Sequence, residues 1–224
     1  TLKNNNETPT NRTDDTSYLG LDLTDLSAEF IGVDEVTLQV WDVALKVNQA
    51  RDTDTNPSNN PTKVDWATFF ENTEGLTPAA ALTVDSSVDI SAEGSAAIEI
   101  SDFVQVYGSF AFSKSSAVSV TSVAANGIAT SGIVTDVMTF GLEGVNVFVG
   151  DGPYFQDENE DSKISDEDLV NEDAVGLLLK DVSLALALFK PTVALGNYYA
   201  VSARAESLEL VGLKRRQTWE GAAL

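Results

Sequence analysis

The chain of 224 residues contains no cysteine and no histidine, and it has a single methionine. Without cysteine it can form no disulfide, and without either residue it lacks the ligands that most transition-metal sites use. Nucleophilic catalysis by a Ser-His or Cys-His pair is excluded for the same reason. Such a shortage of oxidisable groups fits a bacterial extracellular setting.

Basic residues are also scarce, because 13 Lys and Arg stand against 35 Asp and Glu, for a formal net charge of −22. Nucleic-acid binding needs clustered Lys and Arg, and anionic membranes repel an acidic protein, so we expect neither as a partner. No apolar run reaches transmembrane length, which argues against membrane insertion. A glycosidase-type carboxylate pair stays open on composition alone, but no pair is singled out, and we expect no enzymatic activity.

One acidic stretch, residues 157–168, has the spacing of a twelve-position calcium loop. Side-chain oxygens fall at positions 1, 3, 5, 9 and 12: Asp157, Asn159, Asp161, Ser165 and Asp168. Lys163, at position 7, would contribute its backbone carbonyl, and Ile164 would point away from the ion and anchor the loop to the core. Because every donor is oxygen, the sequence predicts a Ca²⁺ site. The alternative is a solvated acidic loop.

These twelve residues resemble the calcium loops of dockerins and other EF-hand-like sites, which implies Ca²⁺ as the cofactor. Two positions depart from the EF-hand pattern: Ser162 stands where glycine usually permits the bend, and Asp168 replaces the bidentate Glu, as in dockerins. No entering helix is expected, because residues 150–153 contain glycine and proline. Ser165 and Asp168 predict a capping box at the start of an exiting helical turn.

The rest of the chain alternates between apolar and polar side chains. The clearest case is residues 82–100, where the even positions are apolar or small apart from Ser86. A period of two is typical of a strand with one buried and one solvated face. We therefore expect an all-β domain of long alternating strands, arranged as a sandwich or as a β-solenoid, with one EF-hand-like calcium loop.

Glycines mark the expected breaks in this pattern. Asn126-Gly127 is the strongest turn signal, and the alternation changes face at Glu143-Gly144, which indicates a β-bulge. The run from residue 82 to residue 112 is too long for one strand. We therefore expect turns or bends at residues 93–95 and 101–102.

Residues 18–33 align without gaps to residues 198–213. The identical pairs are Tyr18/Tyr198, Ser27/Ser207, Glu29/Glu209 and Gly32/Gly212. Self-similarity at a fixed spacing is typical of repeat proteins. We predict a polar linker or arm at residues 1–17 and an all-β repeat domain at residues 18–197 that contains the calcium loop. Residues 198–224 are either the start of a second, truncated repeat or a C-terminal strand.

Long alternating strands, the calcium loop and the acidic, cysteine-free composition together resemble the giant tandem-repeat surface proteins of bacteria, which include adhesins and filament-forming proteins. The resemblance implies a structural or adhesive calcium-binding domain, outside the cell or on its surface, whose partners are neighbouring copies of itself or tandem repeats. The alternative is a calcium-dependent carbohydrate-binding module that stacks aromatic residues on sugar rings. Its candidates are Trp41, Trp66, Tyr107, Tyr154, Tyr198 and Tyr199. Core packing is the commoner role of such residues.

Overall fold

The computed structural model describes residues 2–4, 10, 15–30, 33, 35–52, 61–71, 82–101, 103–159, 161, 163–165, 167–193 and 196–212. Of these residues 70% are in β-strands and 3% in a helix, so the all-β prediction is confirmed. Residues 2–4 of the predicted linker form a short strand. Most of residues 1–17, and all of residues 213–224, lie outside the described residues.

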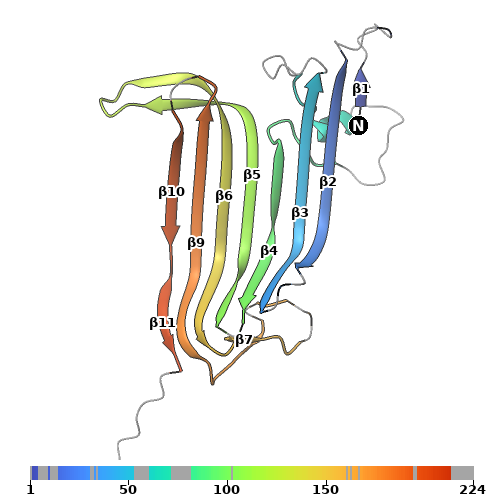
Figure 1. Ribbon diagram of the computed structural model, residues 1–224. Coiled ribbons are helices and arrows are strands. Elements are labelled where there is room, and N and C mark those ends of the chain that lie inside the picture. The colour runs from blue at the N-terminus through green and yellow to red at the C-terminus, as the bar shows by residue number, and fades with distance from the viewer. Residues whose placement is uncertain are drawn as a thin grey trace, which may run out of the picture.

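Most strands belong to one antiparallel sheet in which neighbours follow one another along the chain (Figure 1). They are β1 (Leu2–Asn4), β2 (Thr16–Phe30), β3 (Val36–Asp52), β4 (Ile90–Ile100), β5 (Val104–Val123), β6 (Ala129–Asp151), β9 (Val175–Pro191), β10 (Tyr198–Arg204) and β11 (Ser207–Val211). Both β10 and β11 pair with β9. Strands β7 (Phe155–Gln156) and β8 (Leu169–Val170) form a separate ribbon, and α1 spans Trp66–Glu71. Antiparallel pairing agrees with the sandwich-like alternative, whereas β-helix rungs pair in parallel.

The two faces of the large sheet differ in chemistry because the strand register aligns the alternating residues. One row across the sheet is Phe30, Leu38, Ile98, Val106, Val147, Leu179 and Leu208. Another is Leu23, Leu45, Ala92, Phe112, Phe140, Leu186 and Val201. We call the face that carries these two rows the apolar face. The opposite face carries the row Asp22, Lys46, Ser91, Ser113, Thr139, Ala187 and Ala200, and we call it the polar face.

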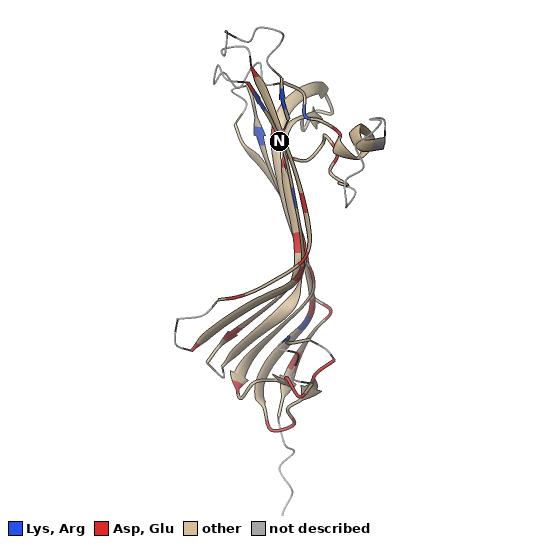
Figure 2. Ribbon diagram, turned by 90° about the vertical axis from the view of Figure 1, so that its right-hand side faces the viewer, with Lys and Arg blue, Asp and Glu red and all other residues tan. Residues whose placement is uncertain are grey.

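A line of β-bulges crosses the sheet part-way along the strands. The register shifts between Leu23 and Leu26, between Trp41 and Ala44, between Tyr107 and Ser109 and between Leu142 and Val145. Near this line Asp25, Asp42 and Asp181 have φ angles of 57°, 52° and 48°, which aspartate adopts more readily than most residues. Because each bulge bends its own strand, the aligned bulges bend the whole sheet (Figure 2).

Two segments cover the polar face, one near each end of the sheet, and both lie on the same side of it (Figure 2). The first cover contains residues 61–71 and 82–89. Its Trp66 is buried against the backbone of Gly20, and the Trp66 indole N–H donates to Asn48 Oδ1 at 3.2 Å. The buried Asn48 amide also donates to the carbonyls of Val64, at 2.8 Å, and Asp85. The Asn48 carboxamide on β3 thus joins this cover to the sheet, together with Asp22 of β2, whose Oδ2 accepts from the Thr83 N–H and hydroxyl.

The second cover, residues 152–174, includes the β7–β8 ribbon and the acidic loop. Its Tyr154 stacks on Phe148 of β6, with ring centroids 5.5 Å apart, and its Phe155 meets Tyr107 of β5 edge to face at 5.0 Å. These side chains belong to the main buried cluster of the fold. The predicted calcium loop is thus part of the layer that closes one end of the polar face.

Candidate calcium site

The β7–β8 ribbon determines where the acidic loop begins and ends. Phe155 pairs with Val170, and Gln156 pairs with Leu169. Positions 1 and 12 of the loop, Asp157 and Asp168, directly adjoin the paired residues Gln156 and Leu169. The two ends of the loop are therefore held side by side, as a closed ligand loop requires.

Side chains at the first alternate positions turn into the loop. Both Asp157 Oδ1 and Asn159 Oδ1 accept a hydrogen bond from the Asp161 N–H, at 3.2 and 3.0 Å. Asp161 Oδ1 in turn accepts from the Lys163 N–H at 2.8 Å. The Asp157 and Asn159 side chains thus point to the Asp161 backbone, and the Asp161 side chain points to the Lys163 backbone.

Asp168 is the most buried of the predicted ligands, at 7% exposure. Its Oδ2 accepts from the Ser165 N–H at 2.7 Å, and Ser165 Oγ accepts from the Glu167 N–H at 3.1 Å. These bonds form one side of the predicted capping box, although the described residues make a turn here and not a helix. Asp168 Oδ1 is buried without a hydrogen-bond partner.

The surroundings of Asp168 disfavour the charged form of its carboxylate. Burial raises the pKa of Asp168, and the nearby carboxylates of Asp157 and Asp161 raise it further, against the opposing hydrogen bond from the Ser165 backbone. A bound divalent cation would reverse this balance, because it offsets the repulsion among the three carboxylates and gives the unpartnered oxygen a ligand role. The all-oxygen donor set fits Ca²⁺.

The described part of the loop contains no three acidic side chains that already converge to a metal-holding distance. Glu160, Ser162 and Asp166 lie outside the described residues, and so does the bend expected at Ser162. The residues available as ligands are the predicted ones: Asp157, Asn159, Asp161, Lys163 through its carbonyl, Ser165 and Asp168.

The loop is anchored to the sheet mainly by groups that do not belong to the ligand set. Ile164 packs against the buried cluster, as predicted. The buried Gln105 amide on β5 donates to the Phe155 carbonyl at 3.0 Å and accepts from the Phe155 N–H at 2.9 Å, like an extra strand pairing. Within the second cover itself, Asn171 donates to the Pro153 carbonyl at 3.0 Å. Sequence reasoning missed Gln105 and Asn171, because a polar residue in an alternating run or after a strand normally faces solvent.

We expect Gln105→Ala to loosen the second cover. The substitution leaves the buried N–H and carbonyl of Phe155 unpaired, which should lower the free energy of unfolding by about 2–4 kcal/mol. Hydrogen exchange should show faster exchange in residues 154–170 than in β4 or β6. Gln49→Ala, on β3 away from this cover, is the matched control. An equal loss of stability in both variants would contradict the assignment.

The aromatic residues considered for sugar stacking are placed differently from a stacking platform. Trp41, Tyr107 and Tyr154 belong to the buried cluster, and Trp66 is buried in the first cover. Tyr198 and Tyr199 are 48% and 76% exposed, but as neighbours in β10 they point to opposite faces of the sheet. These six residues therefore provide no exposed coplanar pair.

Comparison with protein-family models, with curated proteins and with solved structures finds no match to this chain. In the part of the chain that the structure describes, no helix is long and apolar enough to cross a membrane. We therefore infer the function from the geometry of the sheet and of the loop.

Proposed function

We propose that the chain is a structural repeat unit of a bacterial extracellular surface or filament protein. In this proposal, successive units extend one continuous β-sheet, and Ca²⁺ orders the second cover of each unit. The observation that carries the proposal is the similarity between the two edges of the sheet: the β10–β11 edge aligns to β2 without gaps, places the aligned side chains on the same face and breaks within one residue of the same position.

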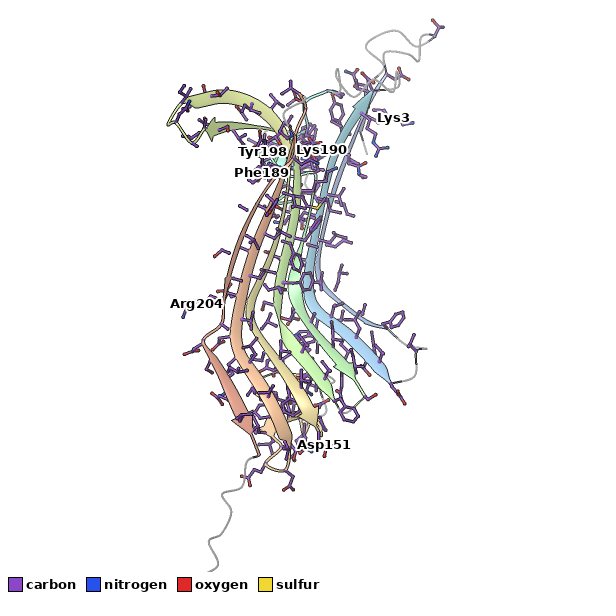
Figure 3. The ribbon with its side chains drawn as sticks, turned by 60° about the vertical axis from the view of Figure 1, so that its left-hand side comes forward. Lys3, Asp151, Phe189, Lys190, Tyr198 and Arg204 are labelled. Atoms are coloured by element: carbon purple, nitrogen blue, oxygen red, sulfur yellow. The ribbon has the colours of Figure 1, made fainter. Side chains whose placement is uncertain are left out.

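The alignment of residues 18–33 with residues 198–213 places equivalent structural features together. The pairing of β2 is interrupted between Leu23 and Leu26, which correspond to residues 203 and 206. On the other edge, β10 ends at Arg204 (Figure 3) and β11 begins at Ser207. The breaks in the two edges therefore lie within one residue of the same aligned position.

The alignment also preserves which face each side chain occupies. The aligned pairs on the apolar face are Leu21/Val201, Leu23/Ala203, Ala28/Leu208 and Phe30/Leu210. A displacement of one residue would move every side chain to the opposite face. The β10–β11 edge thus stands beside β9 as the β2 strand of a following unit would.

The outer edge of β2 is available for the reciprocal contact. β1 pairs with β2 only through Thr16, Ser17 and Tyr18, and no described strand pairs with the outer side of residues 19–30. An unpaired edge is a template for another strand. In an array, β9 of the preceding unit would occupy it.

A two-unit chain tests this proposal: residues 1–197 followed directly by residues 18–224, so that Tyr18 of the second unit stands where Tyr198 stands now. Val201 pairs with Leu186, and the aligned equivalent of Val201 is Leu21. We therefore expect Leu186→Cys in the first unit and Leu21→Cys in the second to form a disulfide under mild oxidation. The chain has no other cysteine that could compete for either thiol.

The matched control replaces Asp22 of the second unit, in place of Leu21, by cysteine. Asp22 is adjacent in sequence but points to the polar face, so its thiol should not reach position 186. Equal cross-linking of the two pairs, or none with Leu21→Cys, would sink the proposal that units continue one sheet.

A further inference from the structure

The apolar face is a surface that the proposed repeat-unit function does not use. Between the row that contains Ile100 and the row that contains Ala92, every residue that is paired in register on this face is apolar or glycine. Many of its large side chains are exposed, including Phe30, Ile98, Leu177, Val201 and Leu210, the last at 66%. Both covers lie on the polar face, so no described segment shields the apolar one.

The size of this face matches a stable protein interface. With strands about 4.8 Å apart and a rise of about 3.3 Å per residue, the region between these two rows measures roughly 29 Å across the strands and roughly 26 Å along them, or about 750 Å². The largest apolar patch on an ordinary monomer is about 300–600 Å². A standard interface buries about 800 Å² on each partner.

The chain's own remaining residues are too few to cover such an area. The longest stretch outside the described residues is 213–224, which spans roughly 40 Å even when fully extended. One strand of that length shields a single strip of a surface that extends from β2 to β10. A second copy of the chain, by contrast, offers an apolar surface of the same size.

We propose that the apolar face of one copy packs against the apolar face of a second copy of this chain, so that the two sheets form a sandwich. Two sheets pack face to face about 10 Å apart when both inner faces are apolar. The chain carries a net charge of −22, which opposes association in general. The apolar face is the one broad surface of the described sheet on which two copies meet without burying those charges, because its register-paired residues between the two rows carry none.

A pair of double variants tests this proposal, and the sheet register supplies the matched control. Leu186 and Val201 pair on the apolar face, whereas Ala185 and Ser202 pair one residue away on the polar face. Leu186→Glu with Val201→Glu should raise the dimer dissociation constant by about 100-fold or more, because two unpaired charges would be buried against the partner. Ala185→Glu with Ser202→Glu adds the same charge to the same strands and should leave the dimer intact. Sedimentation velocity at micromolar concentration measures both.

A second measurement does not depend on the charged variants folding. A spin label on Leu186→Cys should be immobilised in the native chain and give an inter-label distance, whereas a label on Ala185→Cys should be mobile. A monomeric native chain with a mobile label at residue 186 would overturn the proposal, as would a monomer that co-purifies with acyl lipid. Association that survives the apolar-face variants would also overturn it, yet it would leave the edge-to-edge repeat proposal intact.

Discussion

The melting temperature of the native chain is expected to rise by about 5–10 °C when millimolar Ca²⁺ replaces a chelator. A ligand present at about 100 times its dissociation constant stabilises the folded state by about 2.7 kcal/mol. For a chain of this size, each kcal/mol shifts the melting temperature by about 2–4 °C. The physical origin is Asp168, whose buried oxygen lacks a partner while Asp157 and Asp161 repel it. Calorimetry in the two buffers, with Mg²⁺ at equal ionic strength, measures the effect.

Asp157→Ala combined with Asp161→Ala should abolish this calcium response. In chelator the same double variant should melt at or slightly above the native temperature, because it removes the two carboxylates that raise the pKa of Asp168. Glu158→Ala with Glu167→Ala is the matched control, since it removes the same charge from the same loop at positions outside the ligand set. Identical melting of the native chain with and without Ca²⁺ would refute the site.

Gly150→Ala is expected to cost about 3 kcal/mol or more of folding stability, near the upper end for overpacking, because backbone atoms cannot move aside. Gly150 of β6 lies opposite Gly176 of β9, beneath the second cover. A Cβ on Gly150 would stand 2.6 Å from Gly176 Cα and 2.7 Å from the Phe148 ring, and it would overlap the Val175 carbonyl. Urea unfolding monitored by circular dichroism measures the loss.

Gly141→Ala provides the internal standard for this prediction. Gly141 lies in the same strand, but the nearest atoms to a new Cβ are 3.8 Å away, at ordinary van der Waals distance. This variant should be neutral, or more stable by about 0.5–1 kcal/mol, because glycine in a strand interior carries an entropic cost. Equal destabilisation by the two substitutions would show that close backbone packing is not the reason for Gly150.

Local patterns in the sequence predicted local features well. The Asn126-Gly127 turn forms between β5 and β6, and the pairing of β6 shifts at Glu143-Gly144, as expected. In contrast, no turn ends the strand at residues 93–95: β4 continues from Ile90 to Ile100 and crosses the line of β-bulges there. Gly94 is required there for another reason: a Cβ would stand 2.8 Å from Val43, at the bulge of β3. One sequence cannot distinguish a glycine that turns the chain from a glycine that admits a neighbour.

Features that depend on contacts across the sheet were beyond the sequence. Alternation over residues 82–88 suggested a strand, but Val84 is buried in the first cover, where its carbonyl accepts from the Trp66 N–H at 3.0 Å. The ligand spacing of the acidic loop could be recognised from residue types alone. The hydrogen bonds between Gln105 and Phe155 could not be predicted, because the two residues are 50 positions apart in the sequence.

The aligned β-bulges form a line across the sheet, and the sheet bends along this line. Backbone groups at this line form fewer ladder hydrogen bonds than those above and below it, so local opening should need the least free energy there. A force that flattens the sheet would change a few backbone dihedral angles near Asp25, Asp42 and Asp181, while the strands on either side keep their pairing. We therefore expect the sheet to bend along this line before its strands separate, and in the proposed array each copy would lengthen under tension without unfolding.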